Sequence, residues 1–274
     1  MEPIFFVHLT DIHLSKPGKT PLFGLVMADK LRNVCAEIGK LQPKPAFVVI
    51  SGDLTHDGDL DDYKFLRSFL REQEIAIGIP IHVALGNHDF RGPFREGYLE
   101  ETPSEESYYY SFTTDGLRVA MLNTQVPGTH DGRIDEQQLA WLRELLAVPA
   151  PRGTIVVHHH PVAPTPTAMM DSHLLQNPQD LAQVLEGTDV IGLLSGHIHF
   201  HNIGQLAGIP CAAADGVAFG LDPSSAEVMR MVDRSGYNLG VVKNGQMVVQ
   251  PMTMPGDHRV LVEYDLKKLQ AAHQ

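Results

Sequence analysis

Five short clusters of histidine, carboxylate and amide side chains recur along the chain, each directly after an apolar run. The clusters are Asp11-x-His13, Gly52-Asp53, Gly86-Asn87-His88-Asp89, His158-His159-His160 and Gly196-His197-x-His199. Imidazole and carboxylate without thiolate favour Mn, Fe, Co or Zn at such a site over a structural zinc–cysteine site. A carboxylate has two oxygens and can bridge two ions, so the residue types predict a di-metal centre.

The spacing within the clusters predicts how the side chains point. One residue between two ligands places both side chains on the same side of an extended segment, because the side-chain period is two. This would account for D-x-H and H-x-H. By the same alternation, His159 would point opposite to His158 and His160, so all three cannot reach one metal from a regular strand. The glycines would allow sharp turns that aim the next side chain inward.

The elements that must position these clusters form an alternating pattern. Continuous apolar runs, typical of strands covered on both faces, occupy residues 4–10, 45–51, 79–85, 108–113, 117–124, 154–160 and 190–199. Amphipathic runs predict helices over residues 28–41, 59–73, 135–147 and 177–187. Asp135 and Asn177 are the expected N-caps of the last two. The alternation predicts an α/β core, in which sites form beyond the carboxyl ends of the strands.

The sequence changes character after about residue 200. Short apolar strands separated by glycines predict a second, more antiparallel sheet. The stretch 222–236 resembles an insertion without a clear partner. We therefore expect one domain, residues 1–274, with a candidate cap or dimerisation insertion around 211–236.

Composition limits the classes of function. A chain of 274 residues with 43% hydrophobic composition can bury a large core, and its net charge of −12 argues against a nucleic-acid polymer as partner. Cys35 and Cys211 form no metal-type pair and predict free thiols in a reducing compartment. The N-terminus lacks signal-peptide features, and no stretch approaches ~18 apolar residues. We expect a cytoplasmic protein without a membrane span.

The clusters together resemble the calcineurin-like metallophosphoesterase superfamily. The motifs DIH, GDLTHDGD, GNHD, HHHP and GHIH follow one another in that family's order between residues 11 and 199. The resemblance implies a four-layer α/β/β/α sandwich of two central mixed sheets flanked by helices. Residues 122–142 and 158–177 further resemble the bacterial class III cyclic nucleotide phosphodiesterases.

The resemblance also implies roles for individual residues. The first metal would be bound by Asp11, His13 and His199, the second by Asn87, His159 and His197, with Asp53 bridging both. The ions would be divalent, with Mn or Fe favoured. His88 would contact the phosphate and protonate the leaving group, and His130 and His173 would contact the substrate.

Other polar residues have more ordinary interpretations. Asp89 would orient His88 or cap the turn, and we favour the structural role. His56 and His160 could contact and orient the metal ligands without binding a metal themselves. His8 would be a core histidine. His82, His201 and His258 would be structural or exposed.

The leading hypothesis is hydrolysis of 3′,5′-cyclic nucleotides, cAMP first, by attack of a metal-bound hydroxide on phosphorus. The alternatives are a phosphodiesterase for glycerophosphodiesters or another small-molecule diester, a phosphomonoesterase, and a non-catalytic binding protein on the same fold. The expected partner is a small-molecule phosphodiester, and the chain would form a homodimer or higher homo-oligomer.

Overall fold

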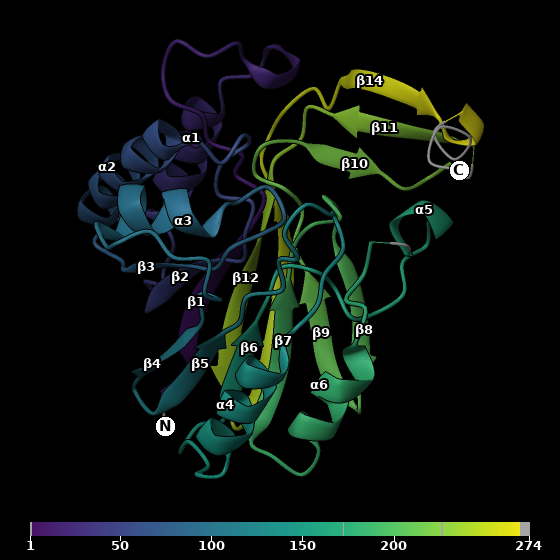
Figure 1. Cartoon of the computed structure of the whole chain (residues 1–274). Helices are drawn as coiled ribbons and strands as arrows, with labels where there is room; N and C mark the ends of the chain where they lie inside the picture. Colours follow the sequence, from purple (N-terminus) through teal and green to yellow (C-terminus); the bar gives the residue numbers. More distant parts are fainter. Residues whose placement is uncertain (1, 172, 226, 269–274) are drawn as a thin grey trace.

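The computed structural model describes residues 2–171, 173–225 and 227–268. Two large β-sheets pack face to face in the middle of the molecule, and helices cover their outer faces (Figure 1). A third, small sheet lies at one end of this sandwich, at the top of Figure 1.

The first sheet has five strands in the order β13-β12-β1-β2-β3. Their bounds are β1 Ile4–Leu9, β2 Phe47–Ile50, β3 Ile81–Val83, β12 Gly236–Lys243 and β13 Gln246–Thr253. The strands β1, β2 and β3 are parallel, whereas β12 pairs antiparallel with β1. The three parallel strands end at the edge where the motifs DIH, GDLTHDGD and GNHD begin.

The second sheet has six strands in the order β4-β5-β6-β7-β9-β8. Their bounds are β4 Tyr110–Thr114, β5 Leu117–Met121, β6 Thr154–Val157, β7 Val190–Ser195, β8 Asn202–Leu206 and β9 Ile209–Ala213. The strands β5, β6, β7 and β9 are parallel. The motifs HHHP and GHIH therefore leave neighbouring parallel strands at the same edge.

The third sheet is antiparallel, in the order β10-β11-β14. Its strands are β10 Gly220–Asp222, β11 Val228–Val232 and β14 Val260–Asp265. The insertion-like stretch 222–236 thus has partners, because β11 pairs with β10 on one side and β14 on the other. We expected the strands after residue 200 to form a second, more antiparallel sheet; β10, β11 and β14 form such a sheet, whereas β8, β9, β12 and β13 extend the two large ones.

Helices enclose the two sheets. The α-helices are α1 Met27–Ile38, α2 Leu60–Ile77, α3 Arg91–Phe94, α4 Glu136–Leu146, α5 Ala168–Asp171 and α6 Pro178–Leu185, with a short 3₁₀ turn η1 Leu22–Gly24 and a π-helical turn η2 Arg95–Leu99. The apolar faces of α1 and α2 pack on the first sheet, and those of α4 and α6 on the second. The helix predicted over 59–73 extends to Ile77 and ends at Gly78, whose φ is 64°. None of the described helices is both long and apolar enough to span a membrane.

Apolar side chains fill the space between the two sheets. Phe6 of β1 stacks on Phe47 of β2 with ring centroids 5.4 Å apart, and both belong to a buried cluster that includes Val119 and Ile155 of the second sheet. Each such side chain stabilises the fold by roughly 1.5–3 kcal/mol relative to exposure. This confirms the predicted four-layer sandwich.

The two predicted helix caps behave differently. The carboxylate of Asp135 accepts a 2.8 Å hydrogen bond from the backbone N–H of Gln138, which confirms it as the N-cap of α4. Asn177 occupies the N-cap position of α6, but its side chain makes no capping hydrogen bond. It instead binds the backbone N–H and C=O of Ile134, so it joins two loops instead of capping the helix.

Candidate metal centre

The residues predicted as ligands lie just beyond strand ends, and five of the seven have a left-handed backbone. The strands β1 and β7 end at Leu9 and Ser195, before the DIH and GHIH motifs. Positive φ values occur at Asp11 (52°), His13 (41°), Asp53 (49°), His197 (71°) and His199 (53°). The period-two explanation of D-x-H and H-x-H is therefore wrong. Such backbone is costly for non-glycine residues and clusters at functional sites, where surrounding structure holds it in place.

The first group of candidate ligands contains Asp11, His13, Asp53 and His199. Their ligand atoms all lie within 4.8 Å of one another, and all four residues are buried. His199 Nε2 lies 3.2 Å from Asp11 Oδ1, and His13 Nε2 lies 3.6 Å from Asp53 Oδ2. The structure therefore brings together the residues predicted for the first metal.

The second group contains Asp53, His159 and His197, again within 4.8 Å and buried. His159 Nε2 lies 3.3 Å from Asp53 Oδ1 and 3.1 Å from Asn87 Oδ1. The amide oxygen of Asn87, the predicted amide ligand, therefore lies beside the second group. Asp53 belongs to both groups and offers one carboxylate oxygen to each, Oδ2 toward His13 and Oδ1 toward His159. This is the geometry that a bridging carboxylate requires.

Two buried atoms test whether these residues fit cations. Among the described residues, Asp11 Oδ1 and His197 Nε2 have no partner in hydrogen-bonding geometry, although both are inaccessible to solvent. Leaving a buried polar atom unsatisfied costs about 1–3 kcal/mol. The other nitrogens of two candidate ligands are held by backbone carbonyls, His159 Nδ1 by Ser51 at 2.9 Å and His199 Nδ1 by Phe219 at 2.8 Å. Metal-binding imidazoles are oriented in this way, so the residues fit divalent ions.

The electrostatics of the centre favour bound cations. Burial acts to raise the pKa of Asp53, but the neighbouring His159 and His88 outweigh it and hold that pKa well below its usual value. Burial, and to a lesser extent the neighbouring imidazoles, lowers the pKa of His13 and His197 well below the usual range, which keeps their imidazoles neutral and able to coordinate. For His159, burial is outweighed by Asp53, which raises its pKa to about 9. Metal binding must therefore displace a proton from His159.

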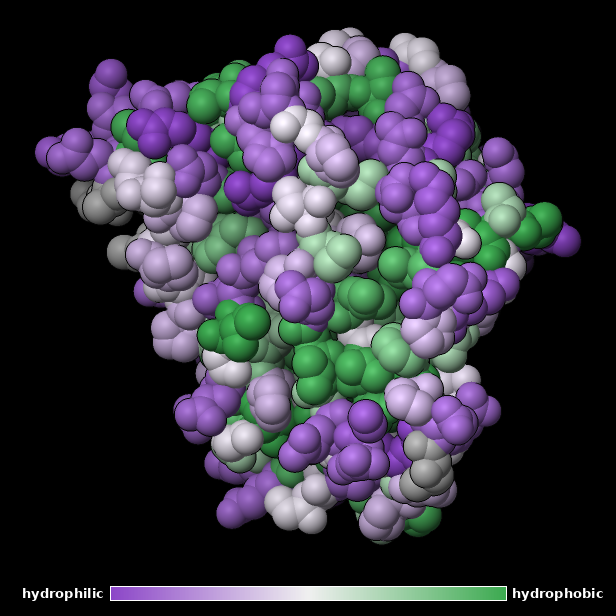
Figure 2. Space-filling view, turned by 180° about the vertical axis from the view of Figure 1, so that it is seen from behind, coloured by the Kyte–Doolittle hydropathy of each residue, from purple (hydrophilic) through white to green (hydrophobic). Residues whose placement is uncertain are grey.

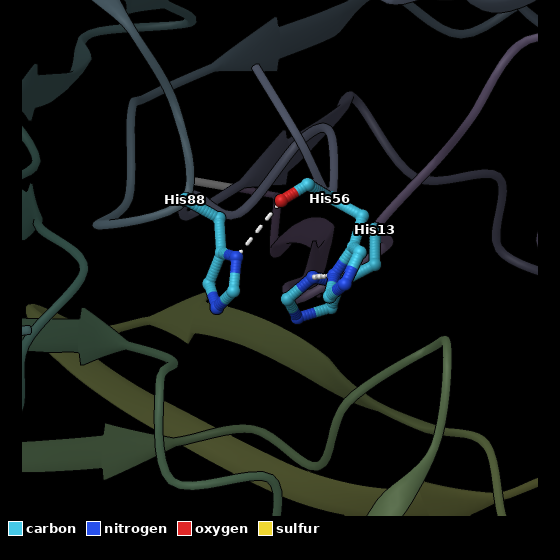
Figure 3. A group of neighbouring side chains, drawn as sticks. All are labelled: His13, His56 and His88. Atoms are coloured by element: carbon cyan, nitrogen blue, oxygen red, sulfur yellow. Dashed lines mark hydrogen bonds between the residues drawn. The ribbon is translucent and has the colours of Figure 1, made fainter. Parts of the chain in front are cut away.

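His88 stands beside the centre with one ring nitrogen occupied (Figure 3). Its backbone N–H donates to Asp53 Oδ1 at 2.9 Å, and its Nδ1 lies 2.9 Å from the carbonyl oxygen of His56. A carbonyl only accepts hydrogen bonds, so Nδ1 carries a proton and Nε2 is the atom that can exchange a proton with a substrate. The His56 ring contacts His13, with their Nδ1 atoms 3.4 Å apart.

Asp89 has a structural role. It is completely buried and accepts hydrogen bonds from the backbone N–H groups of Leu54, Thr55 and Gly86 and from the Tyr63 hydroxyl. Burial and the nearby Asp53 charge raise its pKa to about 6. Its carboxylate joins the GDLTHDGD and GNHD loops, which is the alternative that we favoured from the sequence.

A cavity of about 350 Å³ opens onto both groups of ligands. His88, His130 and His173 all line it, together with His56 and Asn87. His130 Nδ1 lies 2.9 Å from Asn87 Nδ2, and the His173 ring lies 6.1 Å from that of His197. The two histidines predicted to contact substrate are therefore next to the second group.

The three consecutive histidines lie beyond the strand, because β6 ends at Val157, so strand alternation does not decide where they point. His159 alone reaches the ligand groups. His160 lies behind it, with Nδ1 2.7 Å from Thr124 Oγ1, and its ring centroid is 4.5 Å from that of His197. His158 is buried, with Nδ1 2.8 Å from the carbonyl of His160. His8 is a core histidine, 2.9 Å from Ser51 Oγ.

Two features of the site were not identified from the sequence. The first is why glycine stands at positions 86 and 196. We expected these glycines to allow sharp turns, but Gly86 and Gly196 have no positive φ. A Cβ on Gly86 would lie 2.2 Å from Asp53 Oδ1, and one on Gly196 would lie 1.7 Å from Thr10 Oγ1. They are needed for space, not for a turn. The second is an apolar side to the cavity, for which the alternating methionines of VMRMV (228–232) were the available signal.

Comparison with known proteins agrees with this geometry. Residues 6–201 match the family model of the calcineurin-like phosphoesterases. A probable cyclic nucleotide phosphodiesterase of Rhodococcus erythropolis is 38% identical over 219 residues, covering 80% of this chain and 72% of that protein. A cAMP/cGMP dual specificity phosphodiesterase of Mycobacterium tuberculosis is 36% identical over 217 residues, covering 79% of this chain and 68% of that protein.

A solved structure shares the fold. The dimetal phosphatase from Danio rerio superposes with a TM-score of 0.59 at 15% identity, covering 90% of this chain and 98% of that one. The family match covers most of the chain and contains all five motifs. This chain belongs to the calcineurin-like phosphoesterase family.

Proposed function

We propose that this protein is a metal-dependent phosphodiesterase that hydrolyses 3′,5′-cyclic nucleotides, with cAMP as the first substrate to test. The observation that carries the proposal is the pair of ligand groups that share Asp53, with His88 beside them in one cavity. The printed names of the two similar bacterial proteins support the substrate class.

The ligand residues would hold two divalent ions, with Mn or Fe favoured. Asp11, His13 and His199 would bind the first ion. Asn87, His159 and His197 would bind the second, and Asp53 would bind both. When bound, such ions lower the pKa of a coordinated water and neutralise charge on the phosphoryl oxygens.

The chain itself supplies the proton for the leaving group. In hydrolysis, a water oxygen bonds to phosphorus, the P–O3′ bond breaks, and the departing oxygen needs a proton. His88 faces the cavity with Nε2, because Nδ1 is held by the His56 carbonyl, so it would act as the imidazolium and donate its Nε2 proton to O3′. A correctly placed general acid contributes roughly 10²–10⁴ in rate. His130 and His173, on the wall of the cavity, would contact the phosphate or ribose.

A substrate panel on the metal-loaded protein tests this function. The panel contains cAMP, cGMP, bis(p-nitrophenyl) phosphate, glycerophosphoethanolamine and p-nitrophenyl phosphate. We expect kcat/KM to be highest for the cyclic nucleotides. Hydrolysis of bis(p-nitrophenyl) phosphate without hydrolysis of either cyclic nucleotide would refute the proposal, and a preference for glycerophosphoethanolamine would establish the alternative.

A second measurement isolates the acid role of His88. His88→Asn should slow hydrolysis of cAMP, whose alkoxide leaving group needs a proton, far more than hydrolysis of bis(p-nitrophenyl) phosphate, whose phenolate leaves without one. Equal losses on both substrates would assign His88 to phosphate binding alone.

The proposal extends to setting and assembly. Both cysteines are buried and unpaired, which supports a reducing compartment such as the cytoplasm. Apolar side chains gather in the middle of the face seen in Figure 2. Such an area supports association into a homodimer or higher homo-oligomer, which light scattering after gel filtration would measure.

A further inference from the structure

The cavity above the candidate metal centre has two chemically different sides. One side carries the ligand residues with His88, His130 and His173. The other side is apolar, and the described residues that form it are Leu22, Phe23, Met170, Phe219, Leu221, Met229 and Met231. We call this second set the apolar wall. The mechanism proposed above makes no use of it.

The apolar wall begins at the metal ligands. The Phe219 ring stacks on the rings of His199 and His13, with centroids 4.2 and 5.5 Å apart. Phe23 meets Phe219 edge to face, with centroids 5.2 Å apart. A continuous aromatic surface therefore leads away from the ligand residues along one side of the cavity.

The three-stranded sheet forms the outer part of the wall. Met229 and Met231 are two residues apart on β11, so both side chains point from the same face of the sheet. Leu221 of β10 is the register partner of Met231 and also lines the cavity. Arg230, between the methionines, binds Glu263 at 2.7 Å in an exposed ion pair.

The wall is built from segments that are far apart in the chain, and an ion pair anchors the part that the small sheet supplies. The turn η1 supplies Phe23 from one side, and β10 and β11 supply Leu221 and the methionines from the other, at the top of Figure 1. Arg234, just after β11, is paired with the buried carboxylate of Asp215 and donates to the backbone carbonyl of Leu221 at 3.1 Å. The small sheet is thereby tied to the loop that follows β9.

We propose that the apolar wall is the nucleobase subsite, with Phe23, Met229 and Met231 as the residues that decide affinity for the base. This inference rests on the proposed function and adds its specificity determinants. A purine is a flat aromatic group that gains affinity from apolar area, and methionine packs well against aromatic rings. The described members of the wall are apolar, so this side of the cavity would recognise the base by contact area.

The test compares two substrates that differ only in the base: cAMP and ribose 3′,5′-cyclic phosphate, which has none. Met229→Ala combined with Met231→Ala should lower kcat/KM for cAMP roughly tenfold more than for the base-free compound. Replacing both methionines with leucine should instead keep most of the kcat/KM for cAMP, because leucine retains most of the apolar volume. Met252→Ala is the matched control, since Met252 is a partly buried methionine of β13 outside the cavity.

A binding measurement supplies a second readout. With methyl-¹³C methionine in the zinc-loaded protein, 5′-AMP should shift the Met229 and Met231 methyl signals through the ring current of adenine. Ribose 5-phosphate should not shift them, and the Met252 signal should stay in place with either compound.

Two results would overturn the subsite: equal loss of activity on both substrates, or methionine signals that do not respond to 5′-AMP while cAMP is hydrolysed. Failure of the proposed function looks different. In that case the wild-type protein hydrolyses bis(p-nitrophenyl) phosphate but neither cyclic nucleotide, and the base assignment falls with it.

Discussion

Replacing Gly86 with alanine should disable the candidate metal centre, although no candidate ligand is substituted. The new Cβ would lie 2.2 Å from Asp53 Oδ1, 2.4 Å from the Asp53 backbone nitrogen and 2.8 Å from His159 Nε2. Real Cβ contacts are essentially never shorter than 3.0 Å, so these atoms must move apart. Two of the three belong to the carboxylate shared by both ligand groups and to its backbone, which the surrounding loops hold in place.

The expected loss follows from this displacement. The Asp53 oxygen must retreat from 2.2 Å to at least 3.0 Å from the new carbon. A misplacement of about 1 Å in a catalytic arrangement costs about a hundredfold in rate. We therefore expect kcat/KM for cAMP to fall about a hundredfold or more in Gly86→Ala, and the second metal to be lost.

The assay combines metal analysis by inductively coupled plasma mass spectrometry with steady-state kinetics and thermal melting. Gly208→Ala is the matched control: Gly208 has φ 79° in open space, so alanine there is strained but meets no atom. The control should lower stability by about 1 kcal/mol and keep both metals. If Gly86→Ala retains two metals and near wild-type kcat/KM, the close approach of Gly86 to Asp53 and His159 is wrong.

Three further outcomes can be measured with simple variants and reagents. His159→Ala should lose one metal and nearly all activity, whereas His158→Ala should keep both metals and melt at a lower temperature; equal metal loss from both would show that the ligand is misplaced. Burial raises the pKa of both Cys35 and Cys211 to about 12, so the native protein should resist a thiol reagent at pH 8 and react with two equivalents only after unfolding. Burial lowers the pKa of His8 from 6.5 to about 3, so its neutral form stabilises the fold above pH 6.5, and this contribution is lost as pH falls toward 3. Between pH 6.5 and 5 that loss is about 2 kcal/mol, and a His8→Asn variant whose melting temperature falls as steeply as that of the wild type would contradict it.

Much of the core architecture was predictable because neighbouring residues encode it. The continuous apolar runs identified the parallel strands, since a strand covered on both faces needs apolar residues at every position. The residue types in the five clusters indicated metal chemistry, and their order indicated the family. Local capping was predictable at Asp135, where the partner is three residues away, but not at Asn177, whose partner Ile134 is 43 residues away.

The sequence by itself determined which chemistry is available: the ligand types, their attachment to strand ends and the helices between them. Only the tertiary structure decided which atoms meet. It placed the two Asp53 oxygens toward separate histidine groups and set ligands such as Asp11 and His197 in left-handed backbone. It also brought Phe23 and Met229 to one cavity, although some two hundred residues separate them. The physical reason is range: periodicity records what adjacent residues prefer, whereas strand order and loop convergence depend on packing between segments with no local signal in common.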